Sequence, residues 1–387
     1  MGVRIATGLS TRADARDGAV EAAAAARTGL GGQNADLAIV FAAGSHLAAP
    51  ESTLEGVHDA LEPDELIGCG AGGVLAQGRE QEDGTAVAVW AAAFDEGQVS
   101  TFHASVEQVD EGLAVSGLPA LEGAAAAVML PDPFSFPTDV LLRDLASRAA
   151  GVPILGGLAS ARSVGGASAL FLGEEVHEGG AVGARFEGLE VLPCVSQGAA
   201  PLGPEMTITA GEGNVIHELA GRPALQRLRE AIDELDERER GLLGGGMLLG
   251  IVIDGDKPDY EHGDFLVRGL AGADPKTGEV MVGTTVRPGQ VVRLHARDAA
   301  SADRDLRSAL DLRVRALGGE TPAGALLFSC NGRGRGMFGV PDHDASMLVE
   351  ELGGAPTAGF FAAGEIGPVG GENFLHGFTA TVAIFPS

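Results

Sequence analysis

Apolar and polar positions follow a pattern that occurs three times along this chain. Each time, an apolar run precedes a loop, an amphipathic segment and a second apolar run that ends at glycine. Short apolar runs predict buried strands, and apolar residues spaced three and four apart predict a helix. The three segments are 35–41, 51–61 and 66–67 in the first copy, 125–130, 138–150 and 153–155 in the second, and 325–329, 344–352 and 357–358 in the third. This repetition indicates an α/β fold that arose by duplication.

The chain changes character between the second and third copies. Apolar runs that predict strands lie at 179–187, 190–196, 206–210, 247–253, 265–269, 280–285 and 291–295. A helix begins at Pro223, which suits a first helical turn, and a second helix covers 302–317. We therefore expect an α/β fold, mixed α+β in the C-terminal part, in which repeated strand–loop–helix–strand units form two packed domains. The domains divide near residue 221, into 1–221 and 222–387.

The composition and net charge of the chain indicate which kinds of molecule it can bind. The 387 residues are 45% hydrophobic and carry a formal net charge of −28, which repels nucleic acids and anionic membranes. Three cysteines without a CxxC spacing favour a reducing compartment over a disulfide framework. The N-terminal residues lack the apolar core of a signal peptide. We expect a cytoplasmic protein that binds neither nucleic acid nor membrane.

One glycine motif has the residue spacing of a nucleotide-binding loop but not its expected structural context. Gly68, Gly70 and Gly73 have the spacing of a dinucleotide-binding loop, but such a loop opens a helix. Here the polar segment 79–84 follows, which indicates a turn between strands. The scattered histidines and cysteines do not have zinc spacing. We expect no cofactor and no metal.

The loop after the third predicted strand concentrates chemistry-bearing residues. It reads Cys-Asn-Gly-Arg-Gly-Arg-Gly-Met-Phe-Gly over 330–339. Glycines let the backbone approach a ligand, and Arg333 or Arg335 can bind a carboxylate or phosphate with two hydrogen bonds. The alternative is a flexible glycine-rich turn with surface arginines.

Cys330, Glu365 and His376 form a second candidate set. They have the residue types of a nucleophile, an orienting acid and a base. However, a cysteine at the end of an apolar strand is more often an inert core residue. Glu365 lies between glycines, and a carboxylate there contributes nothing to apolar packing. Pairing with Arg333 explains its presence as well as ligand binding does.

The order of these motifs resembles that of the FIST family over nearly the whole chain. The matching N-terminal segments are 36–41, 67–69, 78–80 and 156–157, and 221–225 resembles the junction between the two FIST regions. The most specific C-terminal matches are Cys-Asn-Gly-Arg-Gly at 330–334, Gly-Phe-Phe at 359–361, Gly-Glu-Ile-Gly-Pro at 364–368 and Leu-His-Gly at 375–377.

This resemblance implies a sensory module for small ligands such as amino acids. Many relatives fuse the module to a signalling output domain, whereas this chain shows none beyond the two FIST regions, so we expect the signal to pass to a separate protein. The ligand residues expected from chemistry are Cys330, Asn331, Gly332, Arg333, Gly334, Glu365, Asn373, His376 and Thr379. Arg333 and the 332–336 amides would hold a carboxylate and Glu365 an ammonium group.

Two other functions remain open. A thiol-dependent hydrolase or transferase would use Cys330 with His376, and a protein-interaction scaffold would need no ligand. The site is expected where open α/β sheets bind ligands, at the carboxyl ends of the repeated strands.

Overall fold

The computed structural model describes residues 2–109, 112–162, 166, 168–253, 255, 260 and 264–387. These residues form two compact units. Unit 1 comprises Met1–Val195, Arg307–Leu375 and Ala380–Ser387, and unit 2 comprises Ser196–Leu306 and His376–Thr379. The C-terminal third of the chain returns to the unit that contains the N-terminus.

Unit 1 is built from the three predicted repeats. In each, two parallel strands pair directly and a helix connects them. The elements are β2 (Leu37–Ala43), α2 (Pro50–Leu61) and β3 (Glu65–Gly70); β9 (Ala126–Pro131), α3 (Thr138–Arg148) and β10 (Ile154–Gly157); and β22 (Gly324–Cys330), α8 (His343–Glu351) and β23 (Thr357–Ala362). The first strand of each repeat is buried along its whole length, which explains its uninterrupted apolar sequence. The predicted repeats are confirmed.

Each repeat lies in a sheet of its own. The first sheet has the order β1 (Val3–Ser10), β6 (Ala86–Phe94), β2, β3, β11 (Leu170–Leu172), β12 (Glu175–His177). The second has the order β25 (Glu372–His376), β24 (Glu365–Val369), β10, β9, β13 (Ala181–Glu187), β7 (Gln98–Val109), β8 (Gly112–Ser116). The third has the order β14 (Leu192–Gln197), β26 (Thr379–Phe385), β22, β23, β4 (Val74–Ala76), β5 (Arg79–Gln81).

The repeats exchange hairpins in a cycle. The hairpin β4–β5 follows β3 of the first repeat but pairs with β23 of the third. The hairpin β11–β12 follows the second repeat and pairs with β3 of the first, and β24 of the third repeat pairs with β10 of the second. The segment 79–84, predicted as a turn, therefore contains the strand β5, because its partner β4 is held by a distant repeat. This exchange ties the three repeats into one unit.

The three sheets enclose one apolar core. Alternate residues of all three face inward, among them Phe41 and Trp90 of the first sheet, Phe186 of the second, and Phe360 and Phe385 of the third. Their rings pack directly: the centroids of Phe41 and Phe360 are 4.9 Å apart and those of Trp90 and Phe385 are 5.1 Å apart. Aromatic contacts of this kind add to the stabilisation from area burial.

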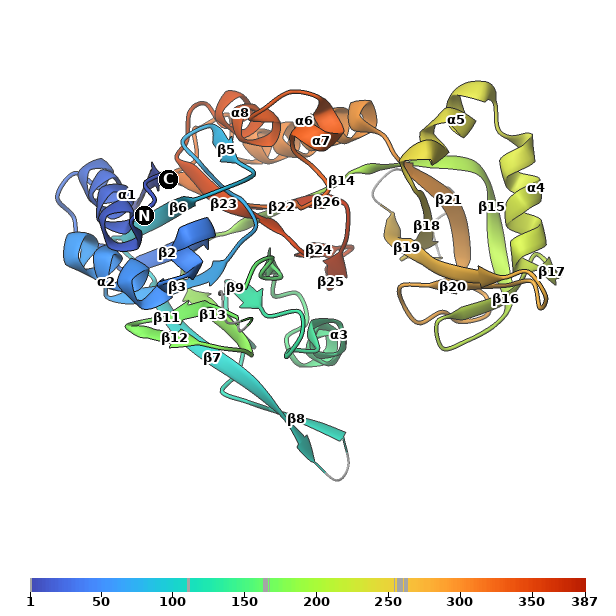
Figure 1. Ribbon diagram of the computed structural model, residues 1–387, viewed down its shortest axis with the longest axis horizontal. Coiled ribbons are helices and arrows are strands. Elements are labelled where there is room, and N and C mark those ends of the chain that lie inside the picture. Colours follow the sequence, from blue (N-terminus) through green and yellow to red (C-terminus); the bar gives the residue numbers. More distant parts are fainter. Residues whose placement is uncertain are drawn as a thin grey trace. The chain divides into compact units, whose positions relative to one another are not determined.

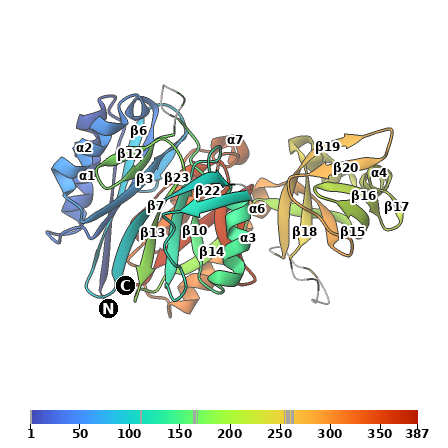
Figure 2. The same cartoon turned by 90° about the horizontal axis from the view of Figure 1, so that it is seen from below.

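The opposite face of the first sheet is covered by α1 (Ala15–Gly29) and α2, which lie side by side (Figures 1 and 2). The helix α1 buries a row of alanines. It lies close to Gly8 of β1, where the Cβ of any larger residue would be 1.9 Å from the carbonyl oxygen of Ala22. Small residues thus allow the helix to approach β1 closely. Neither β1 nor α1 was predicted from the sequence.

Loops from all three repeats meet at the carboxyl ends of the parallel strands. Ser160 accepts a hydrogen bond from the amide of Gly72 at 2.8 Å and donates one to the carbonyl of Phe361 at 2.5 Å. The amide of Leu158 donates to the carbonyl of Gly364 at 2.8 Å. The polar motifs of the three repeats are thereby held at one end of unit 1.

Unit 2 is a single antiparallel sheet. Its order is β15 (Ala199–Glu212), β21 (Val291–Arg297), β18 (Met247–Val252), β19 (Phe265–Asp274), β20 (Glu279–Val282), β16 (Val215–Leu219), β17 (Arg222–Pro223). A further pairing of β15 with β16 joins the sheet to itself. The predicted helix after Pro223 is α4 (Ala224–Glu234), which buries Leu228 and Ala231 in the core of this sheet.

The predicted mixed α+β character of the C-terminal part is confirmed. The remaining helical segments are η1 (Gly44–Leu47), α5 (Glu237–Leu242), η2 (Leu243–Gly245), α6 (Ala299–Ala316) and α7 (Arg335–Phe338). Across the described ranges, no helix is long and apolar enough to cross a membrane.

Candidate functional site

A buried ion pair organises the loop that follows β22. The guanidinium of Arg333 donates from Nε to Asp344 at 2.7 Å and from Nη2 at 2.9 Å. Both side chains are almost inaccessible, with 1% and 0% exposure. A two-point contact fixes the orientation of the guanidinium plane as well as its distance. Arg333 is therefore a rigid group inside unit 1, and only Arg335 of the two arginines in this loop is exposed.

The surroundings of Asp344 keep it ionised. It also accepts hydrogen bonds from Ser329 Oγ at 2.8 Å and His343 Nδ1 at 3.0 Å. Burial alone would raise the pKa of Asp344, but the charge and hydrogen bonds of Arg333 outweigh it, and the pKa lies well below its ordinary value. Burial likewise opposes the charge of Arg333, yet the attraction of Asp344 raises the pKa of the guanidinium. Both members of the pair are charged throughout the physiological pH range.

One nitrogen of the Arg333 guanidinium, Nη1, does not take part in the contact with Asp344. Within the described part of the chain, the buried Nη1 of Arg333 has no hydrogen-bond partner. Electrostatic interactions with Cys330 and Glu365 also raise the pKa of Arg333. A buried donor without an acceptor destabilises the folded state by about 1–3 kcal/mol. An acceptor atom of a ligand could therefore form a favourable hydrogen bond with this nitrogen.

Cys330 and Asn331 begin the loop. Cys330 ends β22 with 9% exposure, and its Sγ accepts the amide of Gly332 at 3.5 Å. The side-chain nitrogen of Asn331, with the amide group oriented to meet its acceptors, donates to the carbonyls of Phe361 and Ala362 at 2.8 and 3.2 Å. Gly334 has φ 78°, a backbone conformation that favours glycine. Asn331 thus fastens the loop to the end of β23.

The exchanged hairpin contributes two acids that sequence reasoning missed. Glu80 Oε1 accepts the amide of Ala345 at 3.0 Å, while the Glu80 amide donates to Asp342 at 2.7 Å. Glu82 accepts the amide of Arg335 at 2.9 Å. These contacts hold β5 against the loop and the start of α8. The sequence signal was the Gly-Arg-Glu motif at 78–80, which was matched to the family but not placed beside Arg333.

Burial raises the pKa of Glu80 to about 7, and the nearby charges of Asp344 and Glu82 act in the same direction. The amide of Ala345 opposes this shift, because its hydrogen bond favours the carboxylate. Glu80 therefore titrates near neutrality beside a pair that does not.

The other predicted residues divide into two groups. Glu365, the first residue of β24, is fully buried and its charge acts on Arg333, so it belongs to the same cluster. Asn373 instead binds backbone: its Oδ1 accepts the amide of Ile154 at 2.9 Å and its Nδ2 donates to Val152 at 2.8 Å. His376 and Thr379 are buried residues of the segment that belongs to unit 2.

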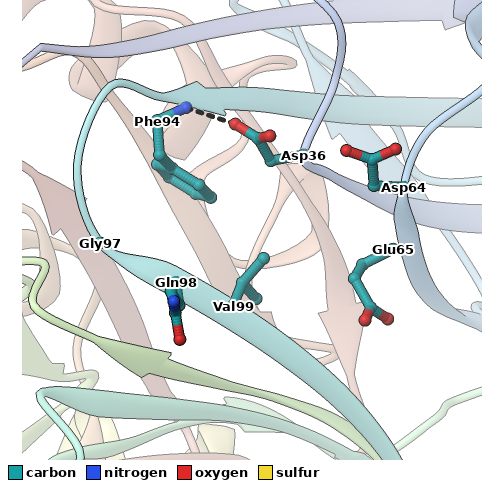
Figure 3. Close-up of a pocket in the computed structure, with 7 residues that line it drawn as sticks. All are labelled: Asp36, Asp64, Glu65, Phe94, Gly97, Gln98 and Val99. Atoms are coloured by element: carbon teal, nitrogen blue, oxygen red, sulfur yellow. Dashed lines mark hydrogen bonds between the residues drawn. The ribbon is translucent and has the colours of Figure 1, made fainter.

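A separate acidic pocket of about 310 Å³ lies at the amino ends of β2 and β3 (Figure 3). Asp36, Asp64 and Glu65 line it, and Asp36 accepts the amide of Phe94 at 2.6 Å. Among the residues that the structure describes, no group of three His, Cys, Asp or Glu side chains could hold a metal ion. The pocket is at the end of the strands opposite to the Arg333 cluster.

Comparisons with known proteins cover both halves of the sequence. The FIST N domain matches residues 36–222 and the FIST C domain matches residues 224–368. The uncharacterized protein Rv0628c of Mycobacterium tuberculosis is 44% identical over 384 residues, which cover 99% of this chain and 100% of that protein. The uncharacterized protein Mb0898c of Mycobacterium bovis is 42% identical and covers 99% of each chain. The chain therefore belongs to the FIST family, whose domains are sensory domains of signal transduction.

Proposed function

We propose that this protein binds an amino acid or another small carboxylate in the cytoplasm and signals through a separate protein. The observation that carries the proposal is the buried Arg333 guanidinium, which Asp344 fixes while Nη1 keeps its hydrogen-bonding capacity. A ligand carboxylate would supply the acceptor that this nitrogen lacks. A charge-assisted hydrogen bond of this kind contributes about 1.5–3 kcal/mol.

The charges around Nη1 favour a zwitterion over a simple anion. Asp344 already balances the charge of Arg333, and the carboxyl group of Glu365 also interacts electrostatically with Arg333. An amino acid brings a carboxylate for Arg333 and an ammonium group for Glu365, and adds no net charge to a buried site. Burying an unpaired charge would be far more costly.

Exposure decreases from the start of this loop to Arg333. Asn331 is exposed and Gly332 is half-buried, whereas Arg333 and Glu365 are buried. Gly332 and Gly334 flank Arg333, and glycine lets a backbone amide contact a ligand closely.

Isothermal titration with a panel of amino acids, other small carboxylates and nucleotides tests the proposal. We expect one class of amino acid to bind, and Arg333→Lys to weaken its affinity about tenfold or more, because lysine retains the charge but not Nη1. Arg335→Lys is the matched control, since Arg335 belongs to the same loop but is exposed. Equal affinities for the protein and a folded Arg333→Lys variant would contradict the assignment, as would a panel that gives no binding at all.

A further inference from the structure

The three cysteines of the chain lie in different electrostatic environments. Cys69 and Cys194 have 0% and 1% exposure, whereas Cys330 has 9%. Burial alone raises the pKa of the Cys69 thiol. Cys330 instead accepts the Gly332 amide at 3.5 Å and interacts electrostatically with the Arg333 guanidinium. Positive charge and backbone amides near a sulfur favour the thiolate, which is the reactive form.

We propose that Cys330 is a redox-sensing thiol, which a small hydroperoxide oxidises to a sulfenic acid that Arg333 Nη1 holds by hydrogen bonding. The unused donor of Arg333 is the second observation behind this assignment, because a thiol brings no oxygen to it and a sulfenic acid does. The guanidinium is already fixed by Asp344, so we expect it to bind the new oxygen without rearrangement.

The step is a two-electron oxidation. The Cys330 thiolate attacks one oxygen of the hydroperoxide, the S–O bond forms and the O–O bond breaks. The sulfur is oxidised and the peroxide oxygen is reduced; the leaving hydroxide or alkoxide takes the proton that the thiol released. With hydrogen peroxide the products are the sulfenic acid and water, which is the first and reversible stage of cysteine oxidation.

Access favours the smallest oxidants. With 9% exposure, Cys330 can be reached by hydrogen peroxide more readily than by a bulky disulfide. The sulfenic oxygen would occupy the donor that the proposed ligand carboxylate uses. Oxidation is therefore expected to compete with ligand binding, but the oxidation itself requires no ligand.

The test uses the full chain with hydrogen peroxide and without any ligand. Peptide mass spectrometry follows the gain of oxygen at each cysteine, with trapping of sulfenic acid by dimedone. We expect Cys330 to react at least tenfold faster than Cys69 and Cys194, which serve as internal controls. Arg333→Lys should slow oxidation of Cys330 at least threefold, whereas Arg335→Lys should leave it unchanged.

Two results would overturn the proposal. One is oxidation of Cys330 at the rate of the other two cysteines. The other is an unchanged rate in an Arg333→Lys variant whose circular dichroism and melting temperature match those of the parent protein. Should that variant not fold, the rate comparison among the three cysteines of the parent protein still decides. Oxidation without any amino-acid binding would support this inference and contradict only the proposed function.

Discussion

The second and third repeats share one topology but treat a buried carboxylate differently. In the second repeat, Asp132 follows β9 directly and accepts hydrogen bonds from the hydroxyls of Ser135 and Ser168 and from the amides of residues 134 and 135. In the third repeat, Asp344 faces the end of β22 through Ser329 and is paired with a buried arginine.

The nearest cation shows the same contrast. Arg162 approaches Asp132 at 3.7 Å but keeps 39% side-chain exposure, and its guanidinium lies 3.8 Å from the ring centroid of Phe134. Arg333 is buried and retains an unused donor. Asp132 thus receives its hydrogen bonds mainly from hydroxyls and backbone amides, whereas the third repeat keeps an unused arginine donor beside its acid. The difference teaches that the chemistry at the end of each repeat depends on the side chains placed there, not on the topology of the repeat.

The largest effect is expected for Asp344→Ala. This variant leaves the Arg333 charge buried without its partner, which should destabilise unit 1 by about 3–5 kcal/mol. Urea denaturation would measure the loss. The double variant Arg333→Met with Asp344→Leu, which removes both charges, should be less destabilised than Asp344→Ala alone. A loss below about 1 kcal/mol for Asp344→Ala would contradict the role of the pair.

A smaller effect, with a clear pH dependence, is expected for Glu80→Gln. Because the folded-state pKa of about 7 is above the ordinary value of 4.5, the stability that protonated Glu80 contributes is complete below about pH 4.5 and is lost as pH rises through 7. Glutamine keeps the acceptor for Ala345 but cannot ionise. The variant should therefore be about 3 kcal/mol more stable than the parent at pH 8 and about equal to it at pH 4.

Thermal unfolding followed at several pH values checks this prediction. Asp83→Asn is the control, because it removes an exposed charge from the segment that follows β5 and should give no such pH-dependent gain. A Glu80→Gln variant that is less stable than the parent at pH 8 would show that the carboxylate is needed as such.

The sequence predicted the repeats because their strands are buried on both faces and their helices are amphipathic. It could not predict the hairpin exchange, since pairs such as Leu170 with Cys69 depend on contacts far apart in the chain. The helix α1 was missed although Asp14 caps it and buried alanines occur at helical spacing over 19–26.

The candidate site was predicted in part. Arg333 stood out because of its glycine neighbours, but its partner Asp344 was placed only as the start of a helix. Glu80 could not be associated with the loop at all, because an exchanged hairpin brings it there. Local pattern therefore indicates which residues carry chemistry, whereas long-range pairing decides which of them meet.

The smallest effect is expected for Arg162→Ala, the counterpart of the Arg333 variants in the second repeat. Arg162 is partly exposed, and Asp132 has hydroxyl and amide donors of its own, so the loss should stay within about 1 kcal/mol. Urea denaturation at low and high salt measures it, and the small contribution should shrink further with salt. A loss as large as that of Asp344→Ala would mean that the second repeat also depends on its arginine, and the contrast between the two repeats would then be wrong.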